Sequence, residues 1–231
     1  MRLVQPRIEP TTSADWDDDS RPLLESIERN SGSVLNIFRT LARHPKLLKR
    51  WSVFEKTELR TERLLIRPWQ SADVADAFSY ASDEEWARYL LNVPQPYTYQ
   101  DAESFITRVS GIDWAREADF AIELNGHAIG GIRLYLVTPA NDVAGLGYNV
   151  GRAYWNKGYV TEAVRAILPY AFGTAGLHKV FATADARNLA SIRVMQKVGM
   201  QQEALLREHR SYRGEHADEV HYGILRSEWQ Q

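Results

Sequence analysis

The stretch GRAYWNKGYVTE, residues 151–162, carries most of the structural information in this sequence, because its glycine-containing turn runs straight into a strongly patterned helix. Beyond the turn, apolar residues recur at helical spacing along one stripe: Val160, Ala163, Val164, Ile167, Leu168, Ala171 and Phe172. Such a stripe predicts a helix that packs on a sheet, so that its N-terminus is fixed in space. Pro169 lies inside the stripe and would cost about 3 kcal/mol in a straight helix, so we expect a kink or break there.

The start of this helix has the features of an anion site. Its first backbone N–H groups, from about Gly158 to Thr161, have no acceptor within the helix. Gly158 leaves room for close approach, Lys157 adds a positive charge, and the helix dipole contributes about half a charge. These features predict a seat for a pyrophosphate. The alternative interpretation is an ordinary strand-to-helix turn whose glycines serve tight packing.

Glycine is also frequent just before the turn. Gly145, Gly147 and Gly151 lie in or beside a strand expected over residues 145–150. Glycine inside a strand weakens it unless something must come close to its backbone. A linear ligand could therefore lie along this strand and end with its phosphates at the helix mouth.

A second pair of polar residues opens the next helix, expected over residues 189–198. Asn188 is a good N-cap, and Ser191 would sit in the first turn of that helix at little cost. In the functional interpretation, Asn188 also bonds an amide of the ligand and Ser191 points its hydroxyl toward the reactive end.

Composition limits the classes of function. The 231 residues are 44% hydrophobic and 25% charged, with a formal net charge of -2 and no cysteine. This balance does not indicate a nucleic-acid binder or a membrane-surface protein. Without cysteine there is no disulfide, thiolate metal site or cysteine nucleophile, and no residues indicate a metal site. Neither a signal peptide nor an apolar run of about 18 residues is visible, so we expect a cytoplasmic protein without a membrane span.

The sequence changes character near residue 57. Before it, helical spacing predicts two or three short helices, with apolar stripes over residues 23–27, 35–41 and 47–51. From residue 58 onward, strands and helices alternate. We expect strands at 64–66, 120–124, 128–137, 145–150, 179–184 and 219–225. A hairpin turn at Asn125-Gly126 is expected to join the second and third of them. Further helices are expected after a cap at Ser71 and after a capping box formed by Thr98 and Asp101. This order indicates an α+β or α/β domain.

Residues 58–228 resemble the GNAT superfamily of acyl-CoA-dependent N-acetyltransferases, specifically its ribosomal-protein-alanine (RimJ/RimL-like) branch. Four ordered blocks carry the resemblance: LRTERLLIRP (59–68), GLGYNVGRAYWNKGYVTEAV (145–164), YAFGTAGLHKVFATADARNLASIRVMQKVGM (170–200) and LLRE (205–208). The resemblance implies a mixed sheet with splayed central strands, helices on both faces, and acetyl-CoA as co-substrate. It also implies a coenzyme A site formed by Tyr148, Asn149, Val150, Trp155, Asn156, Lys157, Gly158, Tyr159, Val160, Thr161 and Asn188.

The implied chemistry is direct transfer of an acetyl group to a neutral amine. A backbone N–H of the glycine-rich strand would steady the oxyanion, and Ser191 would donate a proton to the leaving thiolate. Many family members use a tyrosine further along that helix, where this chain has Val194-Met195-Gln196. Ser191 is therefore the expected catalytic residue.

Three features depart from the family pattern. Gly145 stands where a glutamate often serves as general base. Asp142 and Glu123 are weak substitutes for that base, and the alternative interpretation is that each is an ordinary solvated carboxylate. Asn156 and Val160 replace the small residues usual in the pyrophosphate turn, although asparagine tolerates unusual backbone angles.

The first 55 residues resemble the opening helices of carboxymuconolactone decarboxylase/AhpD-like proteins, through RIEPTTSADWDDDSRPLLESI and LNIFRTLARHPKLLKRWSVF. The reactive cysteine and histidine of that family lie later in its sequence, so its chemistry is not inherited. We expect residues 1–57 to be a helical appendage that lacks catalytic residues and provides a homo-oligomer contact, and residues 58–231 to be the acetyltransferase domain.

Two classes of function remain open from the sequence. One is an N-acetyltransferase acting on a protein N-terminus or a small molecule, and the other is a non-catalytic coenzyme A-binding or scaffold module. Four aromatic residues fit either an acceptor pocket or the core: Trp69, Tyr97, Tyr99 and Trp114.

Overall fold

The computed structural model describes residues 12–16, 21, 24–25, 57–91, 93–112, 117–137, 142–212 and 214–229. The chain divides into two compact units, Met1–Glu55 and Lys56–Gln231. In the first unit, a 3₁₀ helix spans Ser13–Asp15, and the backbone N–H and hydroxyl of Thr12 both donate to the Asp15 carboxylate. Most of the stripes predicted over residues 23–51, and Trp114, lie outside the described residues.

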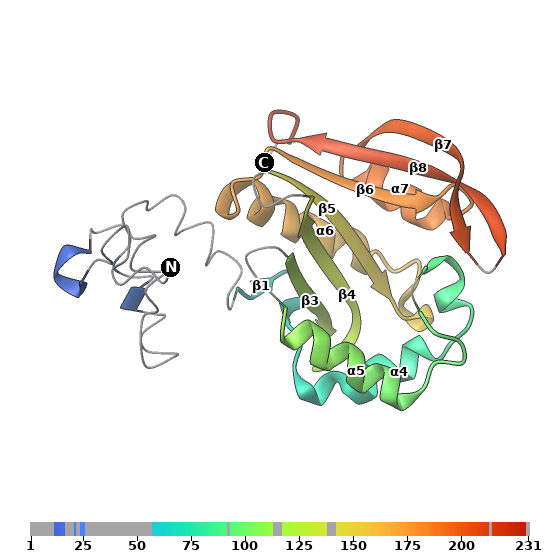
Figure 1. The fold of residues 1–231 in the computed structure, drawn as a ribbon, viewed down its shortest axis with the longest axis horizontal. Coiled ribbons are helices and arrows are strands. Elements are labelled where there is room, and N and C mark those ends of the chain that lie inside the picture. The colour runs from blue at the N-terminus through green and yellow to red at the C-terminus, as the bar shows by residue number, and fades with distance from the viewer. Residues whose placement is uncertain are drawn as a thin grey trace, which may run out of the picture. The chain divides into compact units, whose positions relative to one another are not determined.

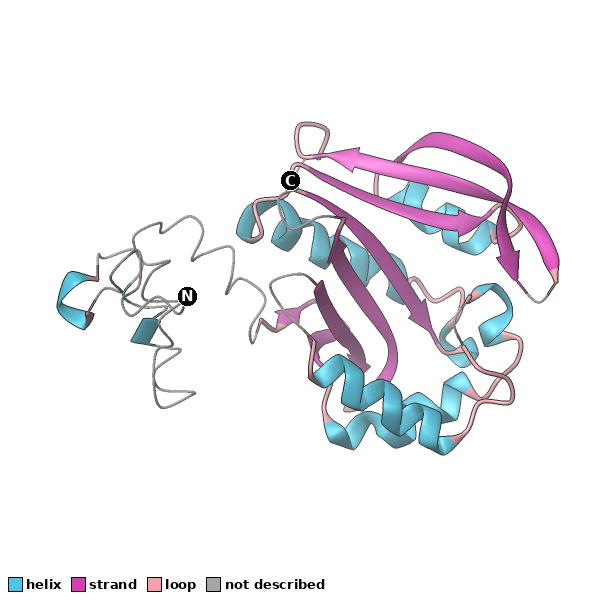
Figure 2. Ribbon diagram, in the orientation of Figure 1, coloured by secondary structure: helices cyan, strands magenta, loops and turns pink. Residues whose placement is uncertain are grey.

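The second unit is built on an eight-stranded sheet of order β1-β2-β3-β4-β5-β6-β8-β7 (Figures 1 and 2). The strands are β1 (Leu59–Arg60), β2 (Leu65–Pro68), β3 (Glu117–Leu124), β4 (His127–Leu136), β5 (Val143–Val150), β6 (Lys179–Asp185), β7 (Gln201–Tyr212) and β8 (Glu215–Leu225). The α-helices of this unit are α4 (Val74–Ala81), α5 (Tyr99–Ser110), α6 (Tyr159–Pro169) and α7 (Leu189–Lys197). Neighbouring strands are antiparallel except β5 and β6, which are parallel. The predicted mixed α+β sheet is therefore confirmed.

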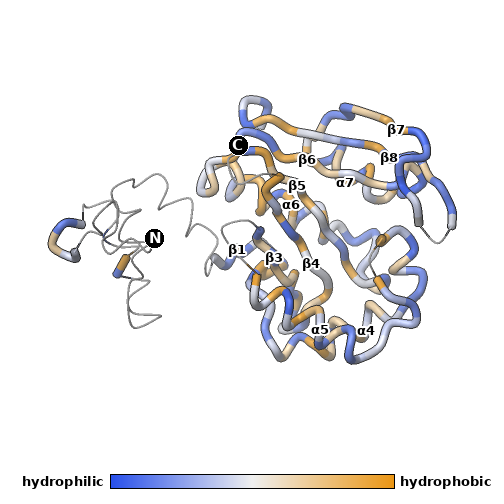
Figure 3. Tube along the Cα trace, viewed as in Figure 1, coloured by the Kyte–Doolittle hydropathy of each residue, from blue (hydrophilic) through white to orange (hydrophobic). Residues whose placement is uncertain are grey.

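Helices cover both faces of this sheet. Phe120, Ile132 and Tyr148 are successive cross-strand partners on β3, β4 and β5, so their side chains share one face. Phe120 packs on Tyr170, just after α6, and Tyr148 reaches α7, so we name this side the α6–α7 face. The central strands are hydrophobic along much of their length (Figure 3).

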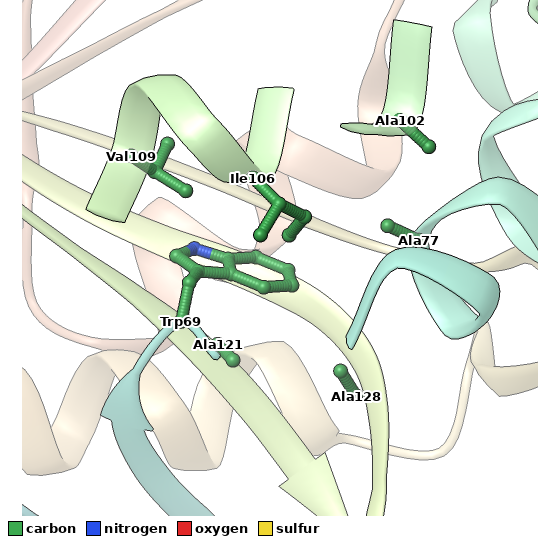
Figure 4. Packing of buried hydrophobic residues seen from close by; sticks show 7 residues of the cluster. All are labelled: Trp69, Ala77, Ala102, Ile106, Val109, Ala121 and Ala128. Carbon is green, nitrogen blue, oxygen red and sulfur yellow. The ribbon is translucent and has the colours of Figure 1, made fainter. Parts of the chain in front are cut away.

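The opposite side is the α4–α5 face. Trp69 lies between Ala121 of the sheet and two residues of α5, Ile106 and Val109 (Figure 4). Its ring meets Phe105 edge to face, with centroids 5.2 Å apart. Burial of such an aromatic side chain stabilises the fold by roughly 2–3 kcal/mol.

The parallel pair β5–β6 separates part-way along its length. Its ladder runs from Val143 and Lys179 to Gly145 and Phe181. Beyond these residues β5 continues to Val150 paired with β4, and β6 continues to Asp185 paired with β8. The two strands therefore diverge, as the family resemblance implied.

Several local predictions are confirmed. Asn125 and Gly126 adopt positive φ of 52° and 84° in the β3–β4 turn, and Thr98 and Asp101 form the expected capping box at α5. The interruption expected at Pro169 is present, because α6 ends there and the chain continues as a π-helical turn, Tyr170–Thr174. Proline supplies no N–H for the α-helical bond.

Other local predictions are wrong. Ser71 does not cap α4; it opens a 3₁₀ helix, Ser71–Asp73, and α4 begins one residue later. The last strand begins at Glu215 rather than residue 219. Strand β7 was not predicted at all, because this edge strand is mostly exposed and polar and so lacks an alternating apolar pattern.

A buried acid lies beneath Trp69. The Asp119 carboxylate accepts a hydrogen bond of 3.0 Å from Trp69 Nε1 and is 6% exposed. Burial raises the pKa of Asp119 to about 6, although the Trp69 hydrogen bond and the charges of Arg108 and Arg133 lower it. The folded chain therefore binds a proton here that the unfolded chain releases near pH 4.

This linkage gives a prediction. The unfolding free energy should fall by up to about 3 kcal/mol as pH rises from about 4 to about 6, because the folded state holds the extra proton over that window. Asp119→Asn keeps an oxygen acceptor for Trp69 but cannot titrate, so it should remove this fall. Denaturant unfolding at a series of pH values measures it, with Glu84→Gln as an exposed control. Identical pH dependence in wild type and Asp119→Asn would contradict the prediction.

Candidate functional site

The turn between β5 and α6 presents unbonded backbone N–H groups. Gly158 caps α6 with a left-handed φ of 81°, and the Glu162 N–H makes the first intrahelical bond, to the Gly158 carbonyl at 3.0 Å. The N–H groups of residues 159–161 precede this bond and have no acceptor within the helix. Asn156 also adopts a positive φ, 59°, which asparagine tolerates, as expected from the sequence.

Side chains hold the turn in place. Trp155 Nε1 donates to the Val150 carbonyl at 2.9 Å, which fastens the turn to the end of β5. The Arg63 guanidinium lies 4.5 Å from the centroid of the Tyr159 ring and donates to the Lys157 carbonyl at 3.1 Å. Arg63 comes from the β1–β2 connection, so a segment almost a hundred residues away braces the helix mouth.

Glu162, in the first turn of α6, is fully engaged. It accepts hydrogen bonds from the Thr61 hydroxyl and from Arg63 Nε, at 2.5 Å and 2.7 Å. Burial raises the pKa of Glu162, but these bonds outweigh it and hold the pKa below its usual range. Arg63 thus offsets the carboxylate in the first turn of α6, which would otherwise repel an anion at this helix mouth.

A cavity of about 750 Å³ opens beside the turn. Gly158 and Thr161 line it together with three cationic residues, Arg63, Arg165 and Lys197. Arg165 donates to the Lys197 carbonyl at 3.2 Å, which links α6 to the end of α7. An adjoining cavity shares Arg165 and Lys197 and continues along apolar residues that include Leu168, Val198 and Trp229. Glu62 and Glu162 line the same cavity, and Glu162 is paired with Arg63, so the helix mouth leads into a hollow with a small excess of positive charge.

Ser191 lies against β5. Its hydroxyl is 3.0 Å from the Tyr148 hydroxyl, and Tyr148 also donates to the Ser191 carbonyl at 3.1 Å. Asn188 Oδ1 accepts from the Ser191 N–H at 3.1 Å, so the predicted N-cap is confirmed. Burial raises the pKa of Tyr148 to about 12, although its hydrogen bond with Ser191 lowers it. Tyr148 is therefore a neutral phenol that can donate a proton.

The candidates that the sequence offered for a family-type base are sterically excluded, engaged in an ion pair, or remote from Tyr148. A β-carbon at Gly145 would overlap the Tyr135 ring, so the family's glutamate does not fit while Tyr135 lies there. Glu123 forms an ion pair of 2.5 Å with Arg67. Asp142 precedes β5, six residues or about 20 Å of strand before Tyr148.

The remaining predicted residues divide into two groups. Lys157, Val160 and Thr161 lie at the helix mouth beside Gly158, with the Lys157 ammonium over the Tyr154 ring at 5.9 Å. Asn149 and Val150 lie on the final turn-side residues of β5. Asn149 Oδ1 is buried without a hydrogen-bond partner among the described residues.

Of the aromatic acceptor candidates, Trp69 belongs to the core (Figure 4). Tyr97 is partly buried against the same cluster, and Tyr99 is 48% exposed. The part of the chain that the structure describes has no helix long and apolar enough to cross a membrane, and it has no group of three or more acidic, histidine or cysteine residues suited to a metal.

Comparison with known proteins identifies the family. The model for the family "Acetyltransferase (GNAT) domain" matches residues 63–201. "Uncharacterized N-acetyltransferase YnaD" of Bacillus subtilis (strain 168) is 33% identical over 172 residues, which cover 74% of this chain and 98% of YnaD. The chain therefore belongs to the GNAT acetyltransferases. The enzyme class expected from the sequence, an N-acetyltransferase with acetyl-CoA as co-substrate, is confirmed at the level of the family.

Solved structures agree on the fold. The GNAT-family acetyltransferase from Bacillus anthracis aligns with a TM-score of 0.67 and 29% identity, over 74% of this chain and 100% of that one. The structure titled "RimL- Ribosomal L7/L12 alpha-N-protein acetyltransferase in complex with Coenzyme A" aligns with a TM-score of 0.68 over 73% of this chain and 98% of that one. Its identity of 13% shows a shared fold alone. The family model begins at Arg63, so the AhpD-like resemblance of the N-terminal segment stays a prediction.

Two residues at this site, Arg63 and Tyr135, were not predicted from the sequence, and neither was one contact of a third, Tyr148. Arg63 lies within a block that carried the family resemblance, yet nothing local showed that it braces α6. Tyr148 was expected to line the ligand through its strand, and its side-chain contact with Ser191 was not expected. Tyr135 was not considered, although its place opposite Gly145 follows from the hairpin register once that register is known.

Proposed function

We propose that this chain binds coenzyme A with its diphosphate on the free N–H groups at the mouth of α6. The supporting observation is that intrahelical bonding begins only at Glu162, behind a left-handed glycine. Contacts are expected from the whole turn and the first helical residues: Trp155, Asn156, Lys157, Gly158, Tyr159, Val160 and Thr161. A helix N-terminus with unobstructed N–H groups is a general phosphate-binding arrangement.

The pantetheine arm fits the divergence of β5 and β6. The Gly151 N–H bonds Ile129 of β4, whereas the Val150 carbonyl is taken by Trp155 on the other side. Because backbone groups of a strand alternate between its two sides, Tyr148 directs its N–H and carbonyl into the divergence. An arm held there, along Tyr148, Asn149 and Val150 and past Asn188, would carry the sulfur to Ser191.

The chemistry proposed is direct acetyl transfer. The amine nitrogen attacks the thioester carbonyl carbon, a C–N bond forms and the C–S bond breaks. The Tyr148 N–H is placed to stabilise the oxyanion. The hydrogen-bonded Tyr148–Ser191 pair supplies a proton to the leaving sulfur. The Ser191 hydroxyl donates this proton, and the Tyr148 hydroxyl donates its own proton to Ser191 in turn.

For the acceptor, we propose a primary amine, including the α-amino group of a protein. The block pattern of the RimJ/RimL-like branch and the stated activity of RimL on a ribosomal protein support this choice, and a small-molecule amine remains the alternative. The cytoplasmic location and the homo-oligomer contact through the N-terminal helices stay predictions, the latter open to sedimentation of the full chain.

Acetyl-CoA turnover tests the proposal. Thiol release should occur with at least one amine in a panel of N-terminal peptides and small primary amines, and mass spectrometry should find one added acetyl group on the acceptor. Tight coenzyme A binding without release from any acceptor would instead favour the non-catalytic binding module.

The Tyr148–Ser191 pair gives a prediction for catalysis. Ser191→Ala and Tyr148→Phe should each lower kcat by about 10- to 100-fold, because each breaks the proton path to sulfur. The double variant should lose much less than the product of the two, since both residues act on one proton. Calorimetric affinity for coenzyme A should stay within about threefold. Wild-type turnover by Ser191→Ala would remove its assigned role.

We propose further that Arg165 and Lys197, which line the cavity beside the turn, contact the 3′-phosphate of coenzyme A, and this gives a second prediction. Arg165→Gln with Lys197→Gln should weaken coenzyme A binding by about five- to tenfold, or about 1 kcal/mol, through the lost contacts with the 3′-phosphate. Binding of 3′-dephospho-coenzyme A should change by less than about twofold. Arg207→Gln, on an exposed part of β7, is the matched control. Equal losses for both ligands would place the 3′-phosphate elsewhere.

A further inference from the structure

Three residues lie in one row across the divergent part of the sheet. Gly145 of β5 pairs with Phe181 of β6, so Gly147 and Thr183 lie two residues further along the two parallel strands. Thr183 in turn pairs with His221 of β8. Because side chains two residues apart share a face, this row lies on the α4–α5 face, opposite Tyr148 and Ser191.

The row contains open space over Gly147. A β-carbon built there would meet no heavy atom within 4 Å. At the neighbouring glycines of this face, the space that a β-carbon would take is occupied: by the Tyr135 ring at Gly145 and by the Tyr80 side chain at Gly151. The backbone at Gly147 is therefore open from the α4–α5 face. A thioester held in the divergence of β5 and β6 would expose its carbonyl carbon to a group entering this space.

His221 has the arrangement of a base held by a carboxylate. Its Nε2 lies 3.2 Å from Glu219 Oε2. A carboxylate only accepts hydrogen bonds, so the neutral ring carries its proton on Nε2 and keeps Nδ1 free to take another. No hydrogen bond to Nδ1 is found within the described residues, and the His221 side chain is 30% exposed, so the ring is partly open to its surroundings.

Glu219 is mostly buried and lies near two side chains of β7. Its side chain is 12% exposed and lies 3.7 Å from Arg210 Nη1 and 3.8 Å from His209 Nε2. The charged and titratable groups on the surrounding strands include Glu219 on β8, His209 and Arg210 on β7, Asp185 on β6, and Arg133 and Tyr135 on β4. Of these groups, Glu219 contacts the His221 ring directly, and Arg210 is paired with the same carboxylate.

We infer that His221 is the general base of the reaction and that the acceptor, a primary amine arriving as an ammonium ion, binds over Gly147. Glu219 is the positioning residue that fixes the tautomer of His221. This inference rests on the proposed function. It assigns to His221 the general-base role that a glutamate at the position of Gly145 often has in the family. In a continuous sheet two strand spacings are about 10 Å. Because β5 and β6 diverge before this row, Gly147 and His221 lie further apart than that, and the acceptor together with water spans the gap.

The proton balance is complete. His221 Nδ1 takes one proton from the ammonium ion, and the neutral nitrogen attacks the carbonyl carbon. The C–N bond forms and the C–S bond breaks. One proton stays on the amide, the proton on His221 passes to solvent, and the remaining proton replaces the one that the Tyr148–Ser191 pair gives to sulfur.

The test compares His221→Ala with wild type. At pH 7, kcat/KM for the amine should fall by about 100-fold, and calorimetric affinity for coenzyme A should stay within about threefold. Imidazole in the buffer should restore part of the activity. The deficit should shrink as pH rises, because at high pH the amine in solution is already neutral. His216→Ala, an exposed histidine on the same strand, is the matched control and should behave as wild type.

Glu219→Gln extends the test to the positioning role. It keeps the volume of the side chain but can favour the other tautomer of His221, so kcat should fall about tenfold with little change in KM. Wild-type kcat/KM in His221→Ala would overturn the inference. A loss that neither imidazole nor high pH relieves would also overturn it, because it would show a purely structural role. A wild-type chain that binds coenzyme A but acetylates no amine would contradict the proposed function itself.

Discussion

The divergence of β5 and β6 after Gly145 and Phe181 is the constraint on which the rest of the site depends. β5 stays with β4 and β6 stays with β8, so backbone groups that face the divergence lack a strand partner. Unpaired backbone groups are costly away from water, and a ligand with its own amides can replace the missing partner. In the proposed complex, the same divergence leads one end of that ligand to the mouth of α6, because the turn after Val150 continues directly into this helix.

The divergence also gives the site two chemically distinct sides. On the α6–α7 face, the phenol of Tyr148 and the hydroxyl of Ser191 form a neutral proton-donating pair. On the α4–α5 face, Gly147 leaves its backbone open and His221 is paired with a carboxylate. A proton acceptor on one side and a proton donor on the other suit a reaction in which nitrogen loses protons while sulfur gains one. In the proposed reaction, the two groups act on one thioester from opposite faces of the sheet.

The parts of this account that the sequence could predict are local. The apolar stripe of α6, Gly158 at its mouth and the cap at Asn188 lie within a few residues of the groups they affect, so spacing was enough to find them. The contacts that were missed join distant segments. Arg63 reaches Glu162 across 99 residues, and Tyr135 fills the space at Gly145 only because of the β4–β5 register. The place of His221 in the row with Thr183 and Gly147 depends on the strand order of the sheet, which the sequence does not show. The edge strand β7 is polar, so it has no alternating apolar pattern that could have predicted it.

The most direct test follows the backbone amides at the mouth of α6 by ¹H–¹⁵N NMR while coenzyme A is titrated into the full chain. The account predicts that the amide resonances of Tyr159, Val160 and Thr161 move strongly to lower field on binding, as expected for N–H groups that begin to donate to phosphate oxygens. Binding with these three resonances unmoved, while others in the domain shift, would contradict the central claim.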